Sequence, residues 1–181
     1  MTGSFCTIKQ AMGALRALLE AGCEVIPIFS PIVCSSDTRF YRAQDLREDV
    51  MRLTGHEIIT SIVEAEPIGP QKLLDAVVIC PCTGNTAAKL VNGIVDTAVL
   101  MAAKAHLRNG GPVVVAIATN DGMSNNGATV GMLQNIKNVY LVPYGQDDAV
   151  HKPTSLIAHM EQVPETLEKA LEGVQLQPLL Q

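Results

Sequence analysis

The sequence predicts a three-layer α/β domain built on a doubly wound parallel sheet. Short apolar runs alternate with helical stretches of about ten residues or more, which is the pattern of successive βαβ units. Aromatic residues make up only 3% of the chain and Trp is absent, and such a composition suits close packing of helices on a sheet. With 181 residues, 48% of them hydrophobic, the chain can bury a proper core, and we expect one domain over residues 1–181.

The order of the expected elements supports this class. Apolar residues repeat at helical spacing from Ile8 to Leu19, and Gly22 follows where a helix commonly ends. Further helices are expected at 41–54, 86–93, 96–108, 132–136 and 164–172. Strands are expected at 23–29, 74–80, 112–118 and 138–142, the first near a sheet edge because Pro27 lacks an N–H group. Residues 56–72 could form either a short helix or a strand.

The beginning of the chain lacks an expected element. The loop Thr2-Gly3-Ser4 opens the first helix, and a loop of this kind normally follows a strand. No residues are present to form that strand. We therefore expect a sheet that lacks its first strand, and a natural protein that is longer at its N-terminus.

Composition argues against several classes of function. A net charge of −5 and a pI near 5.3 leave no basic cluster for nucleic acid, and the arginines between Arg39 and Arg52 are interleaved with acidic residues. No apolar run reaches membrane-spanning length and no signal region is visible, so a cytoplasmic location is expected. The histidines show no metal-binding spacing, and His106 is expected to be exposed. The five cysteines are expected to be reduced packing residues, and no metal site is predicted.

Four loops carry the residues that could bind a ligand. In open α/β sheets the carboxyl ends of parallel strands meet at one edge, where ligands bind. The expected loops offer hydroxyl groups, amides and glycines but few charges, which suits one phosphate and a polar ring system better than a metal or a triphosphate. No dinucleotide or P-loop fingerprint is present. The candidate residues are Thr2, Gly3, Ser4, Ser30, Thr83, Gly84, Asn85, Thr86, Thr119 and Asn120.

One of these loops carries a family resemblance. The run from Pro81 to Lys89 (Pro-Cys-Thr-Gly-Asn-Thr-Ala-Ala-Lys) resembles the signature of FMN-binding flavoproteins related to cysteine and phosphopantothenoylcysteine decarboxylases. Thr2-Gly3-Ser4 resembles the phosphate loop of that family, and Gly93-x-x-Asp96 resembles its G-x-x-D turn. The resemblance implies a Rossmann-like or flavodoxin-like fold and an FMN cofactor, and it adds Lys89 to the candidate cofactor residues.

The sequence also departs from the decarboxylases. Their catalytic histidine aligns with Pro67 here, so no imidazole is available at that position. Their Pro-Ala-Met-Asn motif becomes Ala118-Thr119-Asn120-Asp121, which keeps the asparagine and loses the methionine. Both changes indicate a flavin scaffold without the decarboxylase reaction, although a decarboxylase or a prenyl-transfer-type flavoprotein remains an alternative.

Within the family, nearly the whole chain resembles one component of a two-component oxidoreductase of sporulating bacteria. The resemblance implies a dehydrogenase-like partner that carries NAD(P), a small dicarboxylate substrate that is oxidised to an aromatic product, and the mother-cell cytoplasm as location. A homo-oligomer is expected by analogy. Arg39 is the candidate for binding a substrate carboxylate, or else it pairs with Asp37 or Asp45 on a helix face. Catalytic residues stay unassigned, and a non-catalytic flavin-binding scaffold is a further alternative.

Overall fold

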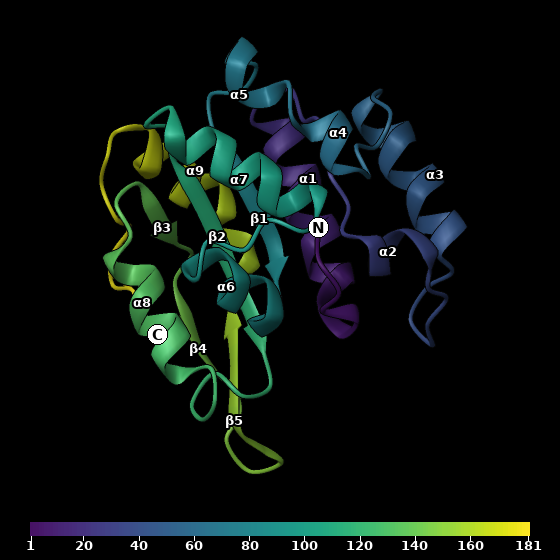
Figure 1. Cartoon of the computed structure of the whole chain (residues 1–181). Helices are drawn as coiled ribbons and strands as arrows, with labels where there is room; N and C mark the ends of the chain where they lie inside the picture. Colours follow the sequence, from purple (N-terminus) through teal and green to yellow (C-terminus); the bar gives the residue numbers. More distant parts are fainter.

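The computed structural model describes all 181 residues and shows a five-stranded sheet between two layers of helices (Figure 1). Its parallel part consists of β1 (Val77–Cys82), β2 (Val113–Thr119) and β3 (Val139–Leu141), with β2 in the middle. Six of the seven residues of β2 are buried, as expected for a strand covered on both faces. The predicted α/β class with a mostly parallel sheet is confirmed.

Helices cover both faces of this sheet (Figure 1). One layer contains α6 (Gly84–Val91), α7 (Ala98–Arg108) and α8 (Gly127–Asn135); α6 contacts both α7 and α8, and the three helices pack against the parallel strands. The other layer contains α1 (Ile8–Glu20) and α9 (Val163–Leu171), which pack together and against the same strands. All five helices were predicted, although α8 begins earlier than expected. None of the helices in the chain combines the length and the apolarity that crossing a membrane requires.

An antiparallel hairpin extends the sheet beyond the prediction. It consists of β4 (Tyr144–Asp148) and β5 (Lys152–Ala158), and β5 pairs with the end of β2 through Ala118 and Thr119. Figure 1 shows the hairpin projecting from the body of the molecule. Its exposed residues are largely polar, so the hairpin lacks the apolar run that marks the other strands.

The prediction of a regular strand at residues 23–29 is wrong. This segment makes one isolated parallel bridge, between Ile28 and Ile59. Pro27 has no N–H group, although its carbonyl accepts from the Ile59 amide over 2.9 Å. The ambiguous stretch that follows forms two helices of four residues each, α4 (Ile62–Ala65) and α5 (Ile68–Gln71).

The remaining elements lie between Ser4 and Thr54 and before α9. They are two short 3-10 helices and two α-helices: η1 (Phe5–Thr7), η2 (Met160–Gln162), α2 (Pro31–Ser35) and α3 (Ala43–Thr54). α3 contacts α2 and lies at the side of the molecule in Figure 1. The predicted helix at 41–54 is thus confirmed, beginning two residues later.

His106 is buried, contrary to the prediction that it is exposed. It lies on the same face of α7 as Val99 and Ala103, at positions spaced by three and four residues, and only 5% of its surface is accessible. Gly111 leaves room for the ring, because a Cβ atom at that position would lie 2.1 Å from Nε2 of His106. Burial lowers the pKa of His106, so the imidazole acts as a neutral core group.

The cysteines are all free. Cys80 and Cys82 are buried in the main core, and burial raises the pKa of each thiol to about 12, which keeps both thiols protonated. Cys6 is exposed, so the expectation of a packing role does not hold for that residue.

Candidate functional site

A polar cavity of about 740 Å³ lies where β1 and β2 end. Its volume falls within the range of roughly 300–1,000 Å³ that is typical of small-molecule sites. The carboxyl ends of neighbouring parallel strands are also the usual location of ligands in such sheets. The lining residues are Gly3, Ser4, Phe5, Cys6, Arg39, Phe40, Thr83, Gly84, Asn85, Ala88, Ala118, Thr119, Asn120, Asp121 and Asn126.

The start of α6 forms one wall of the cavity. Thr83 is the N-cap of this helix, and its hydroxyl oxygen accepts a hydrogen bond from the Thr86 amide over 3.2 Å. The amides of Gly84 and Asn85 belong to the first turn and have no partner within the helix. Together with the positive end of the helix dipole, they make this wall suitable for an anion.

Gly84 brings α6 very close to the loop that follows β2. A Cβ atom at this position would lie 2.5 Å from Oγ1 of Thr119 and 2.7 Å from Nδ2 of Asn126. Any larger residue would push these two loops apart. Gly84 of the predicted motif is therefore required by the close packing of the loops that form the site.

Asp121 organises the loop after β2. Its carboxylate accepts from the hydroxyl of Thr119 over 2.6 Å and from the side-chain amide of Asn126 over 2.8 Å. The hydrogen bond from Thr119 lowers the pKa of Asp121, and the bond from Asn126 adds to this effect. The carboxylate is therefore ionised and held by two groups that also line the cavity.

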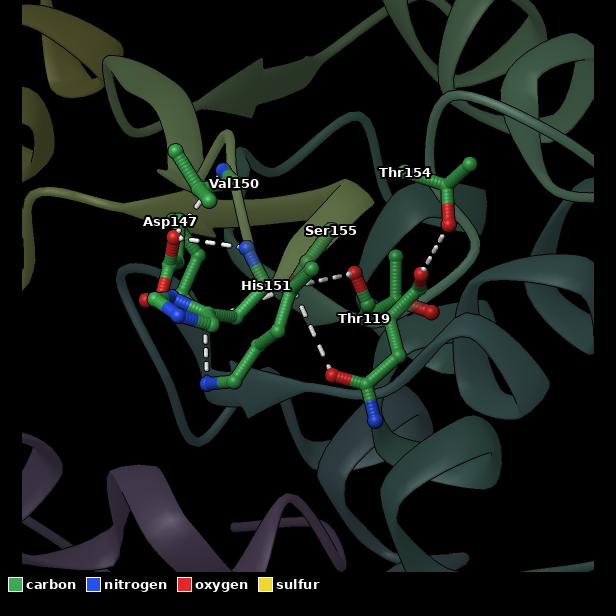
Figure 2. Close-up of polar contacts among 9 residues, drawn as sticks. Thr119, Asp147, Val150, His151, Thr154 and Ser155 are labelled. Carbon is green, nitrogen blue, oxygen red and sulfur yellow. Dashed lines mark hydrogen bonds and ion pairs between the residues drawn. The ribbon is translucent and has the colours of Figure 1, made fainter.

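The β4–β5 hairpin supports the same loop from the other side (Figure 2). The hydroxyl of Thr154 donates to the backbone carbonyl of Asn120 over 2.7 Å. The hydroxyl of Ser155 lies 3.4 Å from both the Thr119 carbonyl and the side-chain oxygen of Asn120. The hairpin, which was not predicted, thus fixes two of the predicted site residues, Thr119 and Asn120.

The hairpin tip is held by its own charged residues (Figure 2). The ammonium of Lys152 lies 2.6 Å from Asp147, and His151 lies 2.9 Å from Asp148. The backbone amides of Val150 and His151 also donate to Asp148, which lowers the pKa of that carboxyl. These contacts close the turn between β4 and β5, and none of the four side chains lines the cavity.

The loop at the start of the chain contributes Gly3 and Ser4. A Cβ atom at Gly3 would lie 2.7 Å from Ile32, so this position also has little room for a side chain. The Ser4 side chain makes no capping hydrogen bond to η1, and its hydroxyl is thus available to a ligand. The predicted phosphate loop therefore reaches the cavity through these two residues.

Arg39 brings the only positive charge to the cavity wall. Its guanidinium stacks over the ring of Phe40, 4.7 Å from the ring centre. Neither expected acidic partner engages it, because Asp37 accepts from the Ala43 amide over 2.8 Å and neither Asp37 nor Asp45 forms an ion pair. The ion-pair alternative for Arg39 is therefore wrong.

Four predicted residues lie outside the lining of the cavity. Thr2 is buried and its hydroxyl is used in hydrogen bonds to Pro81 and Thr83, while Thr86 is buried behind the N-cap. Ser30 is buried as well, and its hydroxyl has no partner. Lys89 forms an ion pair with Asp96, so the aspartate of the Gly93-x-x-Asp96 turn has a structural role.

The other eight predicted residues do line the cavity: Gly3, Ser4, Arg39, Thr83, Gly84, Asn85, Thr119 and Asn120. Phe5, Phe40, Asp121 and Asn126 also line the cavity and were not predicted. Asp121 directly follows the predicted residue Asn120, so the sequence could have indicated that Asp121 belongs to the site. Asn126 comes from the far end of the Gly/Asn-rich loop, and no spacing rule connects it to the site.

The composition of this wall limits its chemistry. Hydroxyl, amide and backbone N–H groups dominate, with one guanidinium and one carboxylate. None of the four histidines lines the cavity, and no group of three or more His, Cys, Asp or Glu side chains is placed to hold a metal ion. The arrangement suits a ligand that combines one anionic group with a polar ring.

Known proteins are similar to this chain over nearly its full length. The B subunit of dipicolinate synthase from Bacillus subtilis (strain 168) is 46% identical over 180 residues, which is 99% of this chain and 90% of that protein. The crystal structure of the corresponding dipicolinate synthase protein from Bacillus halodurans superposes with a TM-score of 0.90 at 44% identity, covering 99% of this chain and 92% of the other.

More distant structures share the fold. The FMN-binding protein AtHal3 superposes with a TM-score of 0.64 at 21% identity, covering 92% of this chain and 91% of the other. A family model described as Flavoprotein matches residues 1–173. The chain therefore belongs to the Flavoprotein family.

Proposed function

We propose that this chain is the flavin-binding component of dipicolinate synthase. In this proposal it acts with the dehydrogenase-like component of that enzyme, in the mother cell of a sporulating bacterium, to oxidise dihydrodipicolinate to dipicolinate. In the overall reaction the substrate loses two electrons and two protons, NAD(P)⁺ on the dehydrogenase-like component gains a hydride equivalent, and one proton passes to solvent. This chain contributes FMN and part of the substrate site, and it assembles as a homo-oligomer that also binds the dehydrogenase-like component.

One observation carries the proposal. The cavity at the ends of β1 and β2 combines an anion-binding helix start with a single guanidinium at its wall. The first feature suits the phosphate of FMN, and the second suits a carboxylate of the substrate. The similarity to two dipicolinate synthase proteins at 46% and 44% identity supports the same assignment.

The residues present fit FMN. The phosphate would be held by Ser4 and by the backbone amides of Gly84 and Asn85. The polar edge of the ring would face the amides of Asn120 and Asn126, and Gly84 allows the close approach of the surrounding loops. FMN, when bound, supplies an acceptor and donor for a hydride or for single electrons.

Arg39 is proposed to bind the substrate. A guanidinium can hold a carboxylate through two parallel hydrogen bonds, and Arg39 is free of protein carboxylates. Its stacking on Phe40 restricts the planar group without using its donors. Dihydrodipicolinate is a dianion, so one positive charge in the cavity wall would also favour its approach.

The decarboxylase alternative has less support. Pro67, at the place of the decarboxylase histidine, caps α5 and lies outside the cavity lining. A carboxylate could still bind Arg39, but no histidine lines the cavity to move a proton. The prenyl-transfer alternative likewise has no specific observation in its favour. A scaffold role without turnover shares the same flavin site and is distinguished by kinetics.

Reconstitution tests the proposed function. Dipicolinate formation would be followed at its ultraviolet absorbance with the dehydrogenase-like component, dihydrodipicolinate and NAD(P)⁺, in the presence or absence of this chain and FMN. We expect the rate to rise at least tenfold only when both this chain and FMN are added. Equal rates without this chain would contradict a catalytic role, and equal rates with and without FMN would contradict the cofactor.

A further inference from the structure

Aromatic side chains are scarce in this chain, yet they gather at the polar cavity. The chain has three phenylalanines; Phe5 and Phe40 line the cavity, and Phe29 is buried in the core. Phe40 is 50% exposed and Phe5 is half-buried, so both rings are accessible to a ligand. The other lining residues are polar or small apart from Arg39, so these two rings are the large apolar groups of the wall.

The turn that presents Arg39 and Phe40 is held by its own hydrogen bonds. The hydroxyl oxygen of Thr38 accepts from the amides of Phe40 and Tyr41, over 3.1 and 3.2 Å. The Thr38 hydroxyl and amide both donate to the Tyr41 carbonyl, over 3.2 and 2.9 Å. Threonine side chains that bond to the backbone in this way fix a turn locally. The exposed Phe40 ring is therefore presented by a turn that is formed without a ligand.

Tyr41 connects this turn to the second ring. The ring of Phe5 packs edge-to-face against Tyr41, with 6.3 Å between the ring centres and 64° between the planes. This is a favourable geometry for an aromatic pair. Because Tyr41 directly follows Phe40, the same turn fixes the surroundings of both rings. We call Phe5 and Phe40 the aromatic wall of the cavity.

Arg39 gives the aromatic wall an anchor for a ligand. Its guanidinium lies over the Phe40 ring, 4.7 Å from the ring centre, and forms no ion pair with a protein carboxylate. A guanidinium that binds a carboxylate through two hydrogen bonds fixes the plane of that carboxylate. A carboxylate on an aromatic ring is conjugated with the ring and favours the ring plane, whereas a saturated ring is puckered. A flat carboxylate is thus oriented as a whole by Arg39, next to side chains that can pack on its ring.

We propose that Phe5 and Phe40 make the cavity selective for planar aromatic carboxylates over saturated carboxylates of the same charge. The inference rests on the proposed function in one respect, namely that Arg39 binds a carboxylate. It adds the class of ring that the cavity recognises and the side chains that recognise it. Thr38 is a positioning residue in this proposal, because it holds the turn and does not line the cavity.

This selectivity bears on the proposed oxidation. The ring of dihydrodipicolinate becomes flat and aromatic as dipicolinate forms. A wall that packs better on a flat ring stabilises the developing product more than the substrate, and such differential binding lowers the barrier of the reaction. The same contacts retain the product after the reaction. The two rings act only by contact, and neither carries an electron or a proton.

Two dicarboxylates of equal charge test the proposal. Benzene-1,3-dicarboxylate is flat, and cis-cyclohexane-1,3-dicarboxylate has the same spacing of carboxylates on a puckered ring. Isothermal titration calorimetry gives the Kd of each for the full chain, with FMN present throughout. We expect the aromatic dicarboxylate to bind about three- to tenfold more tightly, in keeping with the strength of an aromatic pair. The saturated ring has at least as much apolar surface, so burial alone would not produce this preference.

Variants assign the preference to the wall. Phe40→Leu and Phe5→Leu keep an apolar side chain and remove a ring, and each should reduce the preference to about twofold or less. Ile94→Ala is the control, because Ile94 is 48% exposed and lies outside the cavity lining, and it should leave the preference unchanged. Thr38→Val should lower the preference as Phe40→Leu does, and Thr38→Ser, which keeps the hydroxyl, should restore it.

Arg39→Ala separates this inference from the proposed function. If both dicarboxylates bind equally well and both need Arg39, the carboxylate site stands and the aromatic selectivity is overturned. A preference that survives both Phe5→Leu and Phe40→Leu also overturns the inference. If neither dicarboxylate binds, the inference fails together with the substrate role of Arg39, whereas the role of FMN is decided by the reconstitution.

Discussion

The hydroxyl group of Thr2 connects the start of the chain to the end of β1. It donates to the Pro81 carbonyl over 2.8 Å and accepts from the Thr83 amide over 3.0 Å. The two partners are 79 and 81 residues away in sequence, so one buried side chain fixes the distance between two loops of the polar cavity. Thr2 therefore positions two loops of the polar cavity, and its hydroxyl is already used in these two hydrogen bonds.

Replacement of Thr2 by Val should be destabilising although the two side chains have nearly the same shape. The variant leaves the Thr83 amide without its acceptor, and we expect a loss of about 1–3 kcal/mol in the free energy of unfolding. Urea denaturation measures this loss. Thr166→Val is the matched control, because Thr166 is also buried but its hydroxyl donates only to Gln162 within its own helix region. A loss at Thr2 no larger than at Thr166 would contradict the linking role.

The N-cap of α6 should affect both folding and flavin binding. Thr83 and Thr97 each accept a hydrogen bond from a first-turn amide, over 3.2 and 3.3 Å, but only Thr83 lines the cavity. Each change to Ala should cost about 1 kcal/mol of stability. Only Thr83→Ala should also weaken FMN binding, by about tenfold, as measured by quenching of flavin fluorescence. Equal FMN affinities in the two variants would remove α6 from the proposed phosphate site.

The elements that the sequence predicted well are those whose pattern is local. β2 is a continuous apolar run, and α1 has regular helical spacing, so neither needs tertiary information. The segment 23–29 has the same apolar character, but its pairing depends on what lies beside it. The β4–β5 hairpin was missed because its residues are polar and its position depends on pairing with the end of β2.

The residues of the candidate site likewise divide into those that a local pattern predicts and those that depend on tertiary packing. Thr83, Gly84 and Asn85 were predictable because a strand end and a helix start adjoin in the sequence. Thr2 and Ser30 occur in loops of the correct kind, yet their side chains turn inward, and only packing decides that. The helical face that buries His106 could have been found from its spacing to Val99 and Ala103, whereas its charged neighbours suggested the opposite.

Arg39 should determine substrate affinity without affecting the flavin. For Arg39→Ala we expect a KM for dihydrodipicolinate that is about 10- to 100-fold higher, corresponding to the loss of a charge-assisted pair worth roughly 1.5–3 kcal/mol. Arg39→Lys should recover only part of this loss, because an ammonium cannot make the paired contact. Arg52→Ala is the control, since Arg52 is exposed on α3 and pairs with Asp49. A higher Kd for FMN with an unchanged KM would place Arg39 at the cofactor instead.

The buried amino group of Met1 should make the stability of this chain depend on pH. Its pKa is about 6 in the folded protein and 8.0 when the group is free, so between these values the unfolded chain binds more protons than the folded one. Stability should therefore increase from pH 6 to pH 8, by on the order of 2–3 kcal/mol, and the gain should be lost again as the pH falls from 8 to 6. Thermal melting across this range measures the effect. N-terminal acetylation removes the titrating group, so the acetylated chain should lose this part of the pH dependence. An unchanged profile after acetylation would mean that another group is responsible and that the amino group is solvated in the folded protein.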